Sequence, residues 1–190
     1  AGKIVPLVDQ TEGAAGIQVA TAFAFCADSG ITPEIKQEAI RLSRAGQTVV
    51  FTDPKASPTG FPFKVVHMTG TLSETEVYQR RRRICDLGYL RHLYRRDEGT
   101  VGYRCPAEPA ADYVRKGGDE ADTLGRKCIC NCLPATVGLP QVRRTPDGGW
   151  ENEPPLLTAG NDAGTIRDFI PDGADTYSAA DVIRRLLQKA

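Results

Sequence analysis

The stretch GAAGIQVATAFAFC, from Gly13 to Cys26, decides the predicted fold. Its residues are small or apolar, and the apolar run from Ala15 to Phe25 is nearly continuous. A run of this kind is typical of a strand that is buried on both faces of a parallel sheet. We therefore predict a buried strand over residues 15–25, whose small residues let the backbone come close to a neighbouring group.

Helices and strands alternate irregularly after this stretch. Thr32 is a suitable N-cap, Pro33 suits the first helical position, and Gly46 suits a helix end, so we predict a helix between them. Ser73 and Glu76 have the spacing of a capping box, which predicts a helix that runs through the arginines at 80–83. Further predictions are strands at 48–52 and 63–68, helices at 110–116 and 161–170, a polar loop at 143–155 and a last helix capped by Ser178 and Asp181.

Composition indicates an ordinary globular protein. The chain has 190 residues, 41% of them hydrophobic and 25% charged, with a formal net charge of zero. A neutral chain argues against a nucleic-acid partner, so we interpret the run Arg80–Arg83 as a solvated helix face or an ion-pair network, with a phosphate or nucleic-acid contact as the alternative. No apolar run is long enough to span a bilayer, so no membrane contact is expected.

The six cysteines raise a separate question. Without an export signal we expect a cytoplasmic protein with free or metal-bound thiols. Cys128, Cys130 and Cys132 would share one face of a strand, or could converge in a loop. Four cysteines match the ligand count of structural zinc or of an iron–sulfur cluster, and the candidate ligands are Cys85, Cys105, Cys128 and Cys130. Free buried thiols and a redox or disulfide role are the alternatives.

Several motifs resemble a known family. They are Gly13–Phe23, Phe51–Pro54, Ser57–Lys64, Ile84–Arg91, Gly102–Pro109, Gly125–Cys128 and Tyr177–Ile183. Together they resemble the C-terminal portion of a long-tailed bacterial branch of the nitronate monooxygenase (2-nitropropane dioxygenase-like) family. The resemblance implies an α/β fold: the C-terminal end of a TIM barrel, followed by an irregular α+β tail. Residues 1–46 would be the end of an FMN-binding barrel, with its last strand and helix, and residues 47–190 the cysteine-containing tail.

The same resemblance implies a flavin site. FMN would bind at the C-terminal face of the barrel, with its phosphate on backbone N–H groups. Gly2 and Lys3 would lie at the first phosphate loop, Ala20 and Thr21 at the second, and Gln18 near the flavin. No catalytic residue is assigned to this chain, because the family's catalytic histidine belongs to earlier strands. The chain's two histidines, His67 and His92, are expected to be ordinary surface or core residues.

The implied function is that of the C-terminal part of an FMN-dependent oxidoreductase that oxidises nitronates or nitroalkanes with oxygen. This chain alone would be inactive and would bind FMN weakly or not at all. The alternatives are a flavin enoyl reductase-like enzyme of lipid or polyketide synthesis and a non-catalytic, metal-stabilised interaction module. Expected partners are a small-molecule substrate and either a chain that carries the missing barrel strands or further copies of this chain.

Overall fold

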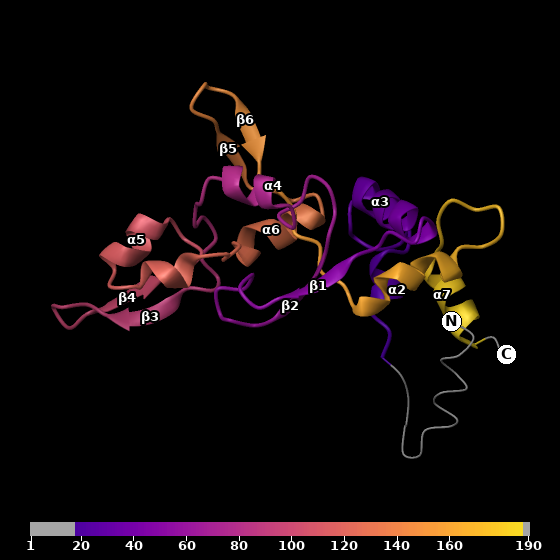
Figure 1. The fold of residues 1–190 in the computed structure, drawn as a ribbon, viewed down its shortest axis with the longest axis horizontal. Coiled ribbons are helices and arrows are strands. Elements are labelled where there is room, and N and C mark those ends of the chain that lie inside the picture. The colour runs from indigo at the N-terminus through magenta and orange to yellow at the C-terminus, as the bar shows by residue number, and fades with distance from the viewer. Residues whose placement is uncertain (1–17, 188–190) are drawn as a thin grey trace, which may run out of the picture. The chain divides into compact units, whose positions relative to one another are not determined.

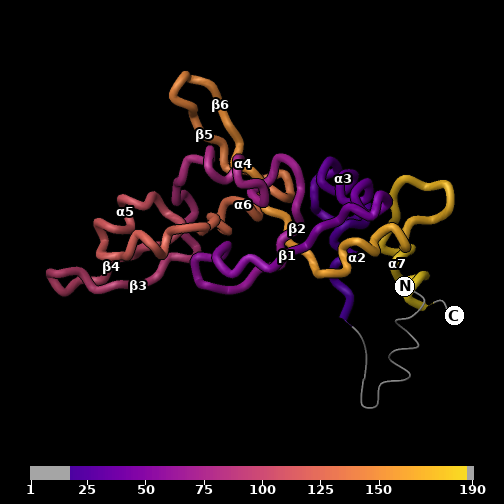
Figure 2. The backbone as a smooth tube through the Cα atoms, viewed as in Figure 1, coloured from indigo at the N-terminus to yellow at the C-terminus, as the bar shows by residue number. Residues whose placement is uncertain are grey.

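The structure is a computed structural model that describes residues 18–187. The chain divides into two compact units, shown in Figures 1 and 2. The first unit combines the chain up to Val50 with the segment from Ala159 onward, and the second unit is Phe51–Thr158. The first crossing lies close to the expected boundary after residue 46, but the sequence did not suggest that the chain returns at residue 159.

The first unit is built from helices. They are α2 (Thr21–Ala24), α3 (Pro33–Arg44), the 3₁₀ helix η2 (Asn161–Phe169) and α7 (Ala179–Leu187). Helix η2 contacts each of the other three, so the returning segment completes the core of this unit. Buried apolar side chains from both segments form that core: Ala22, Phe25, Ile35, Ala39, Ile40, Ala163, Ile166, Phe169, Tyr177 and Val182.

Local signals predicted two of these helices well. Helix α3 begins at Pro33 after the N-cap Thr32, and Gly46 follows it with a φ of 67°. Before α7, the Ser178 N–H donates to Asp181 Oδ2 at 2.8 Å, and the Asp181 N–H donates to Ser178 Oγ at 3.2 Å. The predicted capping box is therefore confirmed. In α7, Val182 is buried, whereas Ile183 and Leu187 are 50% and 71% exposed.

The prediction of a buried strand at residues 15–25 is wrong for residues 18–25, the part of it that the structure describes. Residues 15–17 lie outside the described part, Gln18–Ala20 have no regular structure, and Thr21–Ala24 form a helical turn. The buried positions Thr21, Ala22, Phe25 and Cys26 follow helical spacing rather than alternation. Alanine favours helices over strands. Because no described strand pairs with residues 18–25, this helical preference decides their structure.

The second unit contains three two-stranded sheets. Strand β1 (Val50–Asp53), which begins at the unit boundary, pairs with β2 (Phe63–Val66), and both were predicted within two residues. Strand β3 (His92–Arg95) pairs antiparallel with β4 (Val101–Arg104). Strand β5 (Val142–Arg144) pairs antiparallel with β6 (Trp150–Asn152). The mixed α and β composition is confirmed, and residues 18–187 contain no closed barrel.

Short helices join these sheets. They are α4 (Thr75–Arg80), α5 (Ala110–Arg115), the 3₁₀ helix η1 (Glu120–Thr123) and α6 (Ile129–Thr136). An apolar cluster from strand, loop and helix forms the main core: Val65, Leu72, Ile129, Cys132 and Leu156. The segment before residue 159 crosses this core, because the Leu72 N–H donates to Pro155 O at 2.9 Å and the Val66 N–H to Leu157 O at 3.0 Å.

Three local predictions need correction. The polar loop at 143–155 is the β5–β6 hairpin, which projects beside α4 in Figure 1. Its turn contains Gly148 at a φ of 86°, a conformation that favours glycine. The helix through the arginines ends at Arg80, and Arg81 is extended. The cysteines from Cys128 to Cys132 begin helix α6 rather than a strand or loop. Among residues 18–187, no helix combines the length and apolar character needed to cross a membrane.

Candidate functional site

The residues predicted to bind flavin lie at the start of the described chain. Gly2 and Lys3 fall outside it, while Gln18 and Ala20 are exposed and Thr21 is buried. Thr21 Oγ1 donates to Asp162 Oδ1 at 2.7 Å and accepts from the Gly160 N–H at 3.2 Å. The Thr21 hydroxyl therefore ties the two segments of the first unit together.

Gly160 is required for this arrangement. A Cβ atom at this position would come within 2.3 Å of Asp162 Oδ1 and within 3.0 Å of Thr21 Oγ1. The carboxylate of Asp162 also brings negative charge to the place where the resemblance puts a phosphate. Like charges repel, so Thr21 in this arrangement is a structural residue rather than a ready phosphate ligand.

Three cysteines of the second unit pack together. Cys105 and Cys128 are buried in one apolar cluster with Ala107, and Cys130 packs against it. Cys85 is half-buried in the same unit. We call Cys85, Cys105, Cys128 and Cys130 the thiol cluster. Cys105, Cys128 and Cys130, three of the four cysteines that the sequence singled out as candidate metal ligands, thus pack against one another.

The protein environment keeps the buried thiols of this cluster protonated. Burial raises the pKa of Cys105 to about 11 and that of Cys128 to about 12. Backbone hydrogen bonds from Ala107 and Asn131 act in the opposite direction, because they stabilise the charged form of each sulfur. Beside a metal-bound thiolate, these two amide groups would donate hydrogen bonds that support the ligand.

The thiol cluster is not arranged as a finished metal site. Among residues 18–187, no group of three or more histidine, cysteine or acidic side chains has the geometry to hold a metal ion. All six cysteines are free. Cys132 lies in the main apolar core and Cys26 in the first unit, so neither belongs to the cluster.

A buried ionic network connects the end of α4 with the β5–β6 hairpin. Arg81 Nε donates to Glu153 Oε1 at 2.6 Å, and the Arg143 guanidinium donates to the other oxygen of Glu153. Arg143 Nη2 also donates to Asp86 Oδ2 at 3.0 Å. The side chains of Arg81 and Glu153 are 2% and 0% exposed. Burial lowers the pKa of Arg143, but Glu153 and Asp86 outweigh this effect and raise it.

The arginine run is thus mainly structural. The expected ion-pair network is confirmed for Arg81, and the expected helix face is wrong for Arg81–Arg83 because helix α4 ends at Arg80. Arg83 Nη2 donates to Tyr78 Oη at 2.9 Å and also to the carbonyl oxygens of Thr123 and Arg126. Sequence reasoning missed Glu153 and Arg143 because they lie in the segment predicted as a polar loop.

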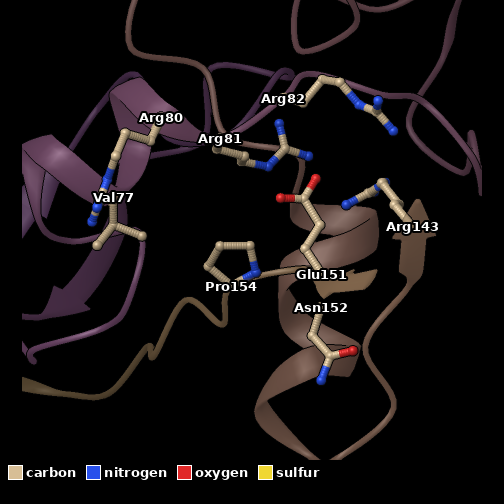
Figure 3. A pocket seen from close by; sticks show the side chains of 8 residues that line it. All are labelled: Val77, Arg80, Arg81, Arg82, Arg143, Glu151, Asn152 and Pro154. Carbon is tan, nitrogen blue, oxygen red and sulfur yellow. The ribbon is translucent and has the colours of Figure 1, made fainter. Parts of the chain in front are cut away.

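A pocket of about 170 Å³ opens beside this network (Figure 3). Arginine side chains dominate its lining: Arg80, Arg81, Arg82 and Arg143. Glu151 supplies the one carboxylate in the lining, with Asn152, Val77 and Pro154 as the remaining residues. We call this the arginine pocket.

Neither histidine is buried, and His92 pairs with Arg104 across strands β3 and β4. His67 and His92 are both exposed, in agreement with the expectation that they are ordinary residues.

No family model, no curated protein and no solved structure matches the chain.

Proposed function

We propose that the chain is the C-terminal part of an FMN-dependent oxidoreductase that resembles nitronate monooxygenases and oxidises nitronates or nitroalkanes with oxygen. The run of family-like motifs from Gly13 to Ile183 carries this proposal. The first unit adds support, since it joins the motif around Thr21 to the motif around Tyr177: Tyr177 Oη donates to Ala22 O at 2.8 Å. Segments that the resemblance assigns to one protein therefore pack as one core.

The bound flavin would supply the redox chemistry of this reaction. This chain would contribute exposed groups near the flavin, namely the side chain of Gln18 and the backbone at Ala20. Thr21 would act indirectly, because its hydroxyl already bridges Asp162 and Gly160. The proposal includes a TIM barrel of which this chain would form only the C-terminal end. The other strands of that barrel would come from residues outside this chain.

The flavin proposal is tested on the protein encoded by the complete gene, purified under native conditions. We expect the absorption bands of oxidised flavin and oxygen uptake that depends on an added nitronate. Gln18→Ala should weaken FMN binding about three- to tenfold, the effect of losing one hydrogen bond. Gln37→Ala is the matched control, because Gln37 is exposed on α3 in the same unit.

Three results would count against this proposal or change it. Protein that neither retains nor takes up FMN would contradict it. Turnover of an enoyl thioester with a nicotinamide cofactor, without nitronate oxidation, would favour the enoyl reductase alternative. Equal FMN affinity in the Gln18→Ala and Gln37→Ala variants would remove Gln18 from the flavin site.

A second candidate function is a metal-stabilised module, and the thiol cluster favours it. Four thiols with two supporting backbone amides match the donor set of zinc or of an iron–sulfur cluster. Ligation requires thiolates, so binding would release protons and draw the sulfur atoms together. Such a centre would stabilise a unit whose sheets have only two strands each.

Metal analysis of protein purified without oxygen tests this candidate. We expect about one zinc ion or one cluster per chain, and loss of most of it in Cys105→Ser and Cys128→Ser. Cys26→Ser is the control, because Cys26 is equally buried but lies in the first unit. Metal-free wild-type protein that also fails to take up zinc or a reconstituted cluster would exclude the module.

A further inference from the structure

The arginine pocket carries more positive charge than its neighbours neutralise. Four arginines line it, namely Arg80, Arg81, Arg82 and Arg143. The carboxylates that face them are Glu151 in the lining and the buried Glu153 and Asp86 behind it. The site therefore keeps an excess of positive charge, which favours an anionic ligand.

Two of the arginines that line this pocket each have a buried nitrogen atom without an acceptor. Arg81 Nη2 and Arg143 Nε are buried and have no hydrogen-bond partner among the described residues. Their side chains are only 2% and 7% exposed, so solvent does not replace the missing acceptor. A buried donor without a partner is costly, and an oxygen-rich ligand beside these side chains would relieve that cost after a small movement.

Three of the lining arginines lie near one another, and the fourth lies apart from them (Figure 3). In Figure 3 the carboxylate of Glu151 is drawn between the side chains of Arg81 and Arg143, and Arg82 extends above them. Both Arg81 and Arg143 donate to the buried Glu153. Arg80 runs along the other side, next to Val77. Planar guanidinium groups bind carboxylates and phosphates through paired hydrogen bonds, and several of them together favour the more highly charged phosphate.

We propose that the arginine pocket binds a phosphoryl group, either as inorganic phosphate or as the phosphate of a small ester. Arg82 and Arg143 contact the anion, and the buried Arg81 adds positive charge without contacting it. Val77 and Pro154 give the pocket an apolar wall, which suits the carbon skeleton of an ester. Glu151 competes with the ligand, since its carboxylate points into the space that the anion would fill. This proposal does not rest on the flavin proposal or on the metal proposal.

Calorimetric titration of the full chain with inorganic phosphate, and separately with glycerol phosphate, tests the proposal. Ionic strength is held constant with chloride, and acetate serves as the carboxylate comparison. We expect saturable binding of one or both phosphates. Arg82→Gln should weaken it about tenfold, as expected for loss of one charged hydrogen bond. Glu151→Gln should tighten it several-fold.

Arg95→Gln is the matched control, because Arg95 is exposed on β3 of the same unit and does not line this pocket. Its affinity should stay within about twofold of the wild type, as for a surface residue without a role. Tighter binding by glycerol phosphate than by inorganic phosphate would identify an ester as the ligand. The proposal fails if neither phosphate binds saturably, if acetate binds as tightly, or if Arg82→Gln weakens binding no more than Arg95→Gln.

Discussion

Glu153→Gln should lower the free energy of unfolding by about 3–5 kcal/mol, the cost of breaking a buried ion pair from one side. The glutamine side chain cannot balance two buried guanidinium groups, and Glu153 contacts both Arg81 and Arg143. Asp86 would remain as the one carboxylate on Arg143. Chemical denaturation measures the loss, and hydrogen exchange should place it between residues 51 and 158.

The control for this variant lies two residues earlier in the same hairpin. Glu151 is exposed on β6, so Glu151→Gln should change the free energy of unfolding by less than about 0.5 kcal/mol. A loss below about 1 kcal/mol in Glu153→Gln would mean that the network is solvated, because exposed ion pairs contribute at most about that amount.

A third variant separates charge balance from packing. This variant combines Arg81→Met, Glu153→Leu and Arg143→Met, and so removes all three buried charges at once. Buried ionic triads are often replaced by apolar residues with little loss of stability. We therefore expect this variant to be more stable than Glu153→Gln. If it is less stable, the network contributes through geometry that apolar side chains do not reproduce.

The network also shows where sequence reasoning reached its limit. The run Arg80–Arg83 was recognisable, and an ion-pair network was one of its interpretations. Its partner Glu153 lies 72 residues from Arg81, within a stretch that looks like a polar loop. No local pattern couples the two positions, so the buried pair follows only from the tertiary fold.

Elements with strong local signals were predictable. The helix that begins at Pro33 and the capping box of Ser178 and Asp181 depend on residues within one helical turn. The segment 15–25 had no such signal, and apolar composition alone does not distinguish a buried strand from a short buried helix. The cysteines are an intermediate case: the sequence singled out four of them, and the packing of Cys105 against Cys128 and Cys130 depends on contacts between distant segments.

Phe25→Ala should destabilise the protein by about 3–5 kcal/mol, the usual cost of emptying a phenylalanine site in a core. Phe25 is 0% exposed and follows helix α2 in the first unit. This core contains side chains from both segments of that unit, including Val182 of α7. The cavity should therefore weaken the early and the late segment together.

Hydrogen exchange distinguishes this result from a local effect. We expect amide protection to fall over residues 18–46 and over 159–187 in Phe25→Ala. Phe61→Ala is the control: Phe61 is 62% exposed, so its removal should cost well under half as much. Loss of protection in residues 18–46 alone would contradict the shared core. It would also remove the support that this core gives to the flavin proposal, because the motifs around Thr21 and Tyr177 would no longer belong to one folded unit.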